Sequence, residues 1–374
     1  MIMHRTFKTF VVGLCAATLT LCTISQAIAC TTFRIQTDDG TWIIGRSMEL
    51  GLDLESQVML VPRGFKLTTT RPDMSTGGSW VTKFGFLGIN TLGNDIATDG
   101  LNQAGLSAHA LYIPGFFEYQ PYPANGKNAL ANTDVVNWIL SNFENIDQVR
   151  KALPDMVVYA LDIPKMGVQP LHWAVKDASG GSIVIEYVKG QLQIHDNPVG
   201  VLTNSPNFDW HMTNLRTHIN LTNINVDALE LATVTIKPLG QGTGLLGLPG
   251  DYTPPSRFLR ATALAHTVKA GATGQQGVNS AFHILNAVDI PIGVVAEKTG
   301  QTADGKPVLA YEQTQWATVY DLKNRVAYFR TYRDLAIHKI DLTRLSFDGK
   351  AIEHVPMSRQ MTYQDVTPLP KSQK

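Results

Sequence analysis

Alternating apolar and polar residues are the clearest pattern near both ends of the chain. Between Thr31 and Glu49 they alternate on both sides of Asp38-Asp39-Gly40, and an Asp-Gly pair between two such runs is a strong hairpin signal. The pattern therefore predicts a hairpin here. Further strand patterns lie at 80–112, with a turn at 102–105, and at 171–175, 182–188, 191–195, 315–322, 325–332 and 337–345.

The loop length of the first hairpin decides which of its residues face each other. A two-residue Asp39-Gly40 loop pairs positions whose numbers sum to 79 and sets Cys30 opposite Glu49. A three-residue loop makes that sum 78 and places Cys30 and Arg46 on one face. Neither regular ladder brings both Arg46 and Glu49 beside Cys30, so we expect a bulge if both serve it.

Helical periods occur between the groups of strands rather than after each strand. Helices are predicted at 133–143, at 146–153 before Pro154, after the loop at 204–210, and at 257–269 and 278–286. Strand groups that flank helix groups argue against a doubly wound parallel sheet. They favour an α+β fold with layered antiparallel sheets and helices outside.

The first 29 residues have the layout of a cleaved export signal. A basic start precedes an uncharged apolar run from Phe10 to Leu21, and Ala27-Ile28-Ala29 is a small-x-small cleavage pattern. The apolar run is too short for a permanent membrane span. We therefore expect a signal peptide at 1–29 and a single domain at 30–374.

Cleavage would change the charge and the cysteine content of the chain. It would leave 345 residues with 29 basic and 31 acidic side chains, a formal charge of −2. No basic stripe suits nucleic acid or anionic lipid, so small molecules are the expected partners. Cys15 and Cys22 would be removed with the signal, which leaves Cys30 as the sole cysteine and the first residue.

A cysteine at a new N-terminus combines a nucleophile with a base. A thiol has a pKa of about 8.5 and an α-amine one of about 7.7–8.0, so the amine can take the thiol proton and later protonate a leaving amine. A guanidinium such as Arg46 would favour the thiolate. A carboxylate such as Glu49 could orient the amine, and an amide side chain could stabilise an oxyanion.

Other patterns suggest different uses of the chain. Ala27-Ile28-Ala29-Cys30 loosely resembles a lipobox, and lipidation of Cys30 would give a lipid-anchored binding protein using the loop at 242–255. The G-x-G-x-x-G match at 242–247 precedes Leu248-Pro249-Gly250 rather than a helix, which argues against a nucleotide site. Four histidines in apolar segments are expected to be packed or surface residues rather than metal ligands: His172, His195, His211 and His283.

Five motifs in order resemble the choloylglycine hydrolase and penicillin V acylase family of N-terminal-nucleophile hydrolases, and more narrowly its exported Gram-negative branch. The resemblance covers the chain from Cys30 to the last strands. The motifs are Cys30-Thr31-Thr32-Phe33, Gly45-Arg46-Ser47-Met48-Glu49, the segment 102–112 ending in Tyr112, Val201 to Pro206, and Gly247 to Asp251 with Pro255-Ser256-Arg257-Phe258.

This resemblance implies roles for six residues. Cys30 would be the nucleophile and, through its amine, the proton carrier. Asn204 would donate to the oxyanion, with the backbone N–H of Tyr112 as second donor. Arg46 and Arg257 would stabilise the thiolate and the transition-state charge, and Glu49, which stands where the family usually has Asp, would hold the amine.

The resemblance also implies a four-layer αββα sandwich, a periplasmic homotetramer and no cofactor. The expected reaction is hydrolysis of linear non-peptide amides through an acyl-thioester. Penicillin V and N-acyl homoserine lactones are the leading substrates, because a periplasmic enzyme with a signal peptide meets them more readily than bile conjugates. Tyr112, where bile salt hydrolases commonly have Asn, is more like penicillin V acylases. Conjugated bile salts are the alternative. Phe116 and Phe117 could line an acyl pocket or belong to the core.

Overall fold

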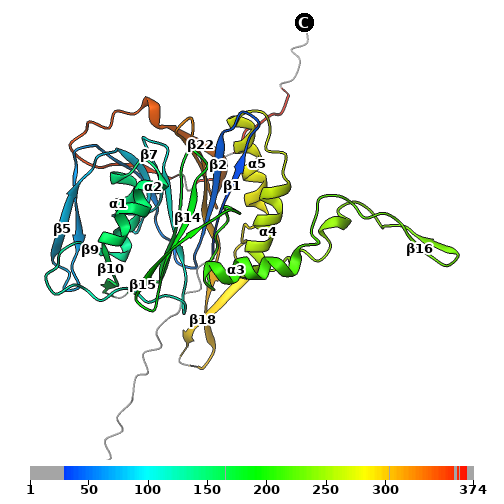
Figure 1. The fold of residues 1–374 in the computed structure, drawn as a ribbon, viewed down its shortest axis with the longest axis horizontal. Coiled ribbons are helices and arrows are strands. Elements are labelled where there is room, and N and C mark those ends of the chain that lie inside the picture. The colour runs from blue at the N-terminus through cyan, green and yellow to red at the C-terminus, as the bar shows by residue number, and fades with distance from the viewer. Residues whose placement is uncertain (1–28, 165, 303, 358–359, 362, 369–374) are drawn as a thin grey trace, which may run out of the picture.

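The computed structural model describes residues 29–164, 166–302, 304–357, 360–361 and 363–368. Except for Ala29, the predicted signal peptide lies outside the described residues. Two antiparallel sheets form the centre of the domain (Figure 1). The smaller sheet contains, in spatial order, β1 (Cys30–Gln36), β2 (Trp42–Glu49), β20 (Thr314–Asp321), β21 (Val326–Thr331) and β22 (Asp334–Asp341).

The larger sheet has eight strands, all antiparallel to their neighbours. In spatial order they are β15 (Gln191–Asp196), β14 (Ser182–Val188), β13 (Leu171–Lys176), β8 (Ser107–Tyr112), β7 (Asn94–Asn102), β6 (Phe86–Thr91), β3 (Gln57–Val61) and β23 (Glu353–Pro356). The remaining strands form two-stranded pairs: β4 (Lys66–Thr70) with β5 (Thr76–Val81), β9 (Ala129–Ala131) with β10 (Val157–Tyr159), β11 (Asp162–Ile163) with β12 (Gly167–Val168), β16 (Leu229–Leu231) with β17 (Val234–Ile236), and β18 (Val295–Gln301) with β19 (Pro307–Glu312).

Helices cover the outer face of each sheet (Figure 1). They are α1 (Val135–Asn142), α2 (Ile146–Ala152), α3 (Phe208–Leu215), α4 (Pro254–Thr267) and α5 (Gly274–Asn286), with short 3₁₀ turns at Asn132–Asp134, Leu153–Asp155, Arg216–His218, Thr243–Leu245 and Leu342–Arg344. Helices α4 and α5 pack on β1 and β2, whereas α1 packs on β7 and β8. No helix among these described residues is long and apolar enough to span a membrane.

Two hydrophobic cores account for this layering. Phe33 of the smaller sheet and Leu111 of the larger belong to one core, which also takes in residues of α4 and α5. Ala110 belongs to the other core, together with Ile139 of α1. Adjacent residues of β8 thus point into different cores, as the period of a strand requires. The layers run helices, sheet, sheet, helices, which confirms the predicted fold class.

The first hairpin follows the three-residue alternative. Thr37 donates its N–H to Thr41 O over 3.0 Å, and Gly40 has a φ of +78°, a left-handed conformation that glycine adopts without strain. Cys30 pairs with Met48, so paired numbers sum to 78. The expected bulge between β1 and β2 does not occur, because their register is regular from Cys30 to Gln36. The irregularity lies instead where β2 pairs with β20, between Met48 and Glu49.

Residues 219–250, here called the arm, extend away from the rest of the domain (Figure 1). The arm carries the β16–β17 hairpin, which the sequence pattern did not predict. The G-x-G-x-x-G match lies at its base, where Gly242 begins a single 3₁₀ turn and no α-helix follows until Pro254. This geometry lacks the helix N-terminus that a dinucleotide site requires.

Candidate active site

Cys30 opens β1 at the edge of the smaller sheet. Its side chain is 1% exposed. The thiol Sγ lies 3.4 Å from Nη2 of Arg46 and 3.7 Å from the sulfur of Met48. The register of the hairpin produces both contacts, because Met48 is directly opposite Cys30 and Arg46 is two residues away on the same face.

The Arg46 guanidinium is fixed from several directions. Nη2 also donates to Ala110 O over 2.9 Å, Nη1 donates to Ser47 O, and the Trp316 ring centroid lies 5.5 Å from Cζ. Burial raises the pKa of the Cys30 thiol, and the Arg46 charge opposes that rise. Arg46 thus lies where a cation would stabilise the thiolate.

The Asn204 side chain joins the start of β1 to the end of β8. Its Oδ1 accepts from the Cys30 nitrogen and from Arg257 Nη2, both at 2.7 Å, and its Nδ2 donates to Tyr112 O over 2.8 Å. These partners fix the orientation of the amide. A side-chain amide has two N–H groups, so Nδ2 has a second hydrogen that could donate to a substrate oxygen.

Arg257, in the first turn of α4, binds the other side of Cys30. Its Nη1 donates to Cys30 O over 2.6 Å and to Thr31 Oγ1 over 2.8 Å, while Nε donates to Tyr252 O over 2.9 Å. The strand β1 is itself bridged to the segment before Asn204, since Thr32 and Leu202 exchange backbone hydrogen bonds of 2.8 and 2.9 Å. These contacts bring residues over 200 positions apart to one point.

Glu49 lies beside this group without a direct bond to Cys30. Its backbone N–H donates to Ala29 O over 2.9 Å, and Thr314 Oγ1 donates to its Oε1 over 3.3 Å. The other carboxylate oxygen, Oε2, has no partner at hydrogen-bond distance. Burial raises the pKa of Glu49 to about 7, although Arg257 acts to lower it. In the intact chain, the backbone N–H of Glu49 therefore binds the carbonyl of Ala29, and the Glu49 carboxylate does not bind the Cys30 nitrogen.

The structure thus brings all six predicted residues to one place. Cys30, Arg46, Asn204 and Arg257 are joined by direct contacts, Tyr112 enters through its carbonyl, and Glu49 acts on the thiol electrostatically, raising its pKa. No group of three or more His, Cys, Asp or Glu residues that could hold a metal ion occurs within the described part of the chain. A thiol between a guanidinium and an oriented amide is suited to nucleophilic attack on a carbonyl.

Sequence reasoning missed a buried cluster behind Arg46. Asp99 of β7 binds Nδ1 of His109 through Oδ1, and its Oδ2 accepts from Thr318 at 2.6 Å and Tyr320 at 2.7 Å. Burial lowers the pKa of His109 to about 4, and Asp99 helps to raise the pKa of Arg46 against the effect of burial. The cluster ties the two sheets together beneath the guanidinium. In the sequence, Asp99 is followed by Gly100 inside a strand pattern, and nothing in that pattern indicated that Asp99 would lie beneath Arg46.

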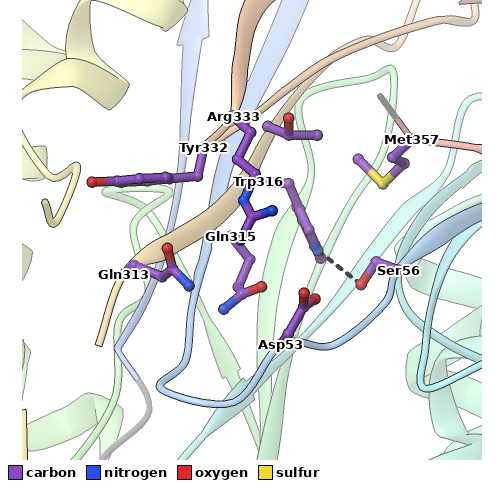
Figure 2. Close-up of a pocket in the computed structure, with 9 residues that line it drawn as sticks. Asp53, Ser56, Gln313, Gln315, Trp316, Tyr332, Arg333 and Met357 are labelled. Carbon is purple, nitrogen blue, oxygen red and sulfur yellow. Dashed lines mark hydrogen bonds between the residues drawn. The ribbon is translucent and has the colours of Figure 1, made fainter. Parts of the chain in front are cut away.

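The cavity drawn in Figure 2 is separate from these groups. It holds about 50 Å³ and is lined by Asp53, Ser56, Gln313, Gln315, Trp316, Thr331, Tyr332, Arg333 and Met357. None of the six predicted residues lines it. Trp316 donates from Nε1 to Ser56 Oγ over 3.1 Å and also packs against Arg46. The volume suits a few water molecules and is far below that of a typical ligand site.

Known proteins resemble this chain over most of its length. The chain is 33% identical over 342 residues to a bile salt hydrolase/transferase of Clostridium perfringens, covering 90% of this chain and 99% of that protein. A penicillin V acylase of Pectobacterium atrosepticum is 25% identical over 358 residues, covering 89% and 86%. The crystal structure of a variant of conjugated bile acid hydrolase from Clostridium perfringens superposes with a TM-score of 0.78 at 30% identity, covering 90% of this chain and all of that one.

The model of one family matches residues 30–354, so the match begins at Cys30 and extends into β23. The chain therefore belongs to the linear amide C–N hydrolases of the choloylglycine hydrolase family.

Proposed function

We propose that this protein, once cleaved before Cys30, hydrolyses linear non-peptide amides through an acyl-thioester. The observation that carries the proposal is the convergence of Arg46 on the thiol and of the Asn204 amide on the Cys30 nitrogen. The α-amine takes the thiol proton, and the thiolate attacks the substrate carbonyl. The amine then protonates the departing nitrogen as the C–N bond breaks, and water hydrolyses the thioester.

Cleavage is the activating step of this proposal. In the intact chain, the Cys30 nitrogen is a peptide nitrogen and cannot act as a base. After cleavage it would gain hydrogens that can bind both Asn204 Oδ1 and the unpaired Oε2 of Glu49. Ala29 is buried and its carbonyl accepts from the backbone N–H of Glu49, so Glu49 already lies next to the bond that cleavage would break. A periplasmic location follows from the proposed signal.

The leading substrates are penicillin V and N-acyl homoserine lactones. What favours them is the residue at position 112, a Tyr where bile salt hydrolases commonly have Asn; its backbone carbonyl accepts from Asn204 Nδ2 over 2.8 Å. Conjugated bile salts are a second candidate, and a specific observation favours them: identity is 33% to a bile salt hydrolase/transferase but 25% to a penicillin V acylase.

One experiment tests the chemistry and separates these substrates. The protein is expressed with its first 29 residues, purified, weighed by mass spectrometry and assayed on one amide of each class. We expect a mass that begins at unmodified Cys30 and release of amine from at least one substrate. A diacylglyceryl adduct would instead support the lipid-anchored binding protein, and cleavage of none of the three amides would contradict the proposed substrates.

The Arg46→Ala variant is expected to shift the titration of the thiol. Iodoacetamide reacts with the thiolate, and removal of a cation 3.4 Å from Sγ destabilises the thiolate. The midpoint of the alkylation rate should therefore move to higher pH than in the wild-type protein. Arg34→Ala is the control, because Arg34 packs on Trp42 and does not contact Cys30. An unchanged midpoint in Arg46→Ala would exclude the proposed role.

The arm supports a proposal about assembly. Leu229, Leu231, Val234 and Ile236 lie on one face of the β16–β17 hairpin, and all four are exposed. A lone two-stranded hairpin is marginally stable in water, and a contiguous apolar face marks an interaction surface. We infer that this face packs against a second copy of the chain within the homotetramer.

Replacing all four of these residues with serine is expected to reduce the mass measured by light scattering from that of a tetramer to that of a smaller species. The matched control replaces Glu230 with Gln and Thr235 with Ser, which lie on the opposite face and bind each other over 2.7 Å. If the serine variant keeps the same mass as the wild type, the arm does not hold the assembly together.

A further inference from the structure

Two buried histidines hold the backbone on either side of the Asn204 amide. His172 Nε2 lies 3.0 Å from Thr203 O, and His211 Nε2 lies 2.9 Å from Asn204 O. Both residues were expected to be packed or surface histidines rather than metal ligands. They are fully buried, and each contacts a carbonyl of the segment that aims the Asn204 side chain. Their own hydrogen bonding therefore bears on the geometry of the oxyanion site.

His172 faces acceptors with both ring nitrogens. A backbone carbonyl such as Thr203 O can only accept, so Nε2 must carry a hydrogen. Nδ1 lies 2.9 Å from Oε1 of Glu186. That carboxylate already accepts from the Phe208 N–H over 3.1 Å and from Asn207 Nδ2 over 3.2 Å. Through Nδ1 and Nε2, the His172 ring therefore links the Glu186 carboxylate to the Thr203 carbonyl.

Glu186 is fixed in its ionised form by its surroundings. Burial alone would raise the pKa of Glu186, but the hydrogen bond and charge of His172, together with His195 and the Phe208 N–H, lower it overall. Its contact with Phe208 also places the carboxylate at the first residue of α3, where the helix dipole favours a negative charge. One carboxylate therefore binds His172 directly and anchors the helix that carries His211.

His211 holds the backbone on the other side of the Asn204 amide. Burial lowers the pKa of His211 to about 4, so the ring is neutral near neutral pH. Its Nε2–H can donate to Asn204 O, while Nδ1 has no partner among the described residues. The ring stacks on Phe258, the neighbour of Arg257, with centroids 4.6 Å apart. Helix α3 thus contacts both the Asn204 backbone and the helix that supplies Arg257.

We propose that Glu186 is a positioning residue of the active site: through the His172 ring and helix α3, it fixes the Thr203–Asn204 backbone and so aims the Asn204 amide at the substrate oxyanion. The inference rests on the proposed function, because it requires that Asn204 stabilise the transition state. Glu186 itself touches neither Cys30 nor its contacting groups, so its effect must pass through Asn204.

The test is a double-mutant cycle between Glu186 and Asn204. Glu186→Gln keeps the shape of the side chain and removes its charge, which weakens its contacts with Nδ1 of His172 and with the Phe208 N–H. We expect kcat to fall about 10- to 100-fold, the range associated with misplacing a catalytic group, with KM little changed. In the Asn204→Ala background, Glu186→Gln should cause no further loss, because the group it positions is already absent.

The outcomes separate this inference from the proposed function. Losses that multiply in the double variant would show that Glu186 acts independently of Asn204, and wild-type kcat in Glu186→Gln would also overturn the inference. If Asn204→Ala alone retained full activity, Asn204 would not stabilise the oxyanion. The proposed role of Glu186 in positioning Asn204 would then also be wrong. The matched control is Asp95→Asn, which breaks an exposed pair with His354 at 2.9 Å and should leave kcat unchanged.

A second measurement does not depend on folding of the Glu186 variant. In wild-type protein labelled with ¹⁵N-histidine, we expect two buried histidines, His172 and His211, whose Nε2–H groups bind backbone carbonyls and exchange slowly with solvent. One of these two signals should be missing from His172→Gln. If His172→Gln removed no such signal, the bond from His172 to Thr203 O would be absent and the inference would be wrong.

Discussion

Cys30→Ala is expected to abolish amide hydrolysis while leaving the protein folded. The variant removes the sulfur that would form the acyl-thioester, and no other cysteine remains in the chain after the proposed cleavage. Loss of the nucleophile from a covalent mechanism lowers kcat on the order of 10⁶-fold. The measurement is the rate of amine release by purified, cleaved enzyme on a substrate that the wild type hydrolyses.

The fold should survive this change because the thiol makes few contacts. Arg46 keeps its hydrogen bonds to the carbonyls of Ala110 and Ser47, so its charge is not left without partners. Circular dichroism and thermal unfolding should therefore resemble those of the wild type. Cys30→Ser tests the same step more finely. Its hydroxyl is barely ionised near neutral pH, so we expect hydrolysis far slower than in the wild type.

A matched cysteine offers the control for both variants. Cys22 lies in the segment that the proposed cleavage removes, so Cys22→Ala should give a mature enzyme identical in mass and activity to the wild type. Substantial hydrolysis by folded Cys30→Ala would rule out the covalent mechanism. Loss of activity in cleaved Cys22→Ala would show that the mature protein does not begin where we propose.

Asn204→Ala is expected to reduce kcat about 10²–10³-fold, with a small effect on KM. Removal of one oxyanion donor has this effect in enzymes that pass through tetrahedral intermediates. The amide is oriented before substrate arrives, because Oδ1 faces the Cys30 nitrogen and Arg257 while Nδ2 faces Tyr112 O. Its second N–H can then donate to the developing oxyanion without rearrangement. Steady-state kinetics on the preferred amide supply the measurement.

An isosteric variant separates hydrogen-bond donation from packing. Asn204→Asp retains an acceptor for the Cys30 nitrogen and Arg257 but removes the donor, so it should be as slow as Asn204→Ala. Asn94→Ala, at an exposed position of β7, serves as the control and should retain wild-type kcat. A loss confined to KM in Asn204→Ala would contradict the oxyanion role and would point to substrate binding instead.

Local patterns in the sequence predicted most of the strands that build the two sheets. Strands β13, β14 and β15 occur within one residue of their predicted bounds, because each alternates or runs apolar between clear turn residues. The pattern missed β3 and β4 and the hairpins at 229–236 and 295–312. The β16–β17 hairpin is exposed, so it has no buried face against the domain to produce a pattern related to the core.

The register of the first hairpin is intermediate between these cases. The Asp39-Gly40 pair indicated a turn, but both loop lengths agreed with the alternation of apolar residues. The pairing of β2 with β20, more than 260 residues away, accompanies a bulge that the hairpin alone does not specify. The local sequence thus limited the register of the hairpin to two choices. In the structure, the hairpin has one of these two registers and β2 also pairs with β20, a strand near the other end of the chain.

The sequence by itself determined the family and predicted the chemistry of this protein. One cysteine placed after a cleavage pattern, with Arg46 and Glu49 returned to it by a short hairpin, already predicted the nucleophile and its immediate surroundings. The resemblance of the motifs around Asn204 and Arg257 to those of the family predicted the remaining groups, since residue types and their order can be read without coordinates. Strand periodicity likewise determined that antiparallel sheets would be layered beneath helices.

Only the tertiary structure decided how those groups are held. Asp99 and His109 beneath Arg46, and Glu186 and His172 behind Asn204, are single polar residues within apolar strands. Such residues look alike in sequence whether they face solvent, a core or an active site. Their roles depend on which strands become neighbours and on burial, which strengthens each electrostatic contact. These properties arise from contacts between distant segments, which no local pattern records.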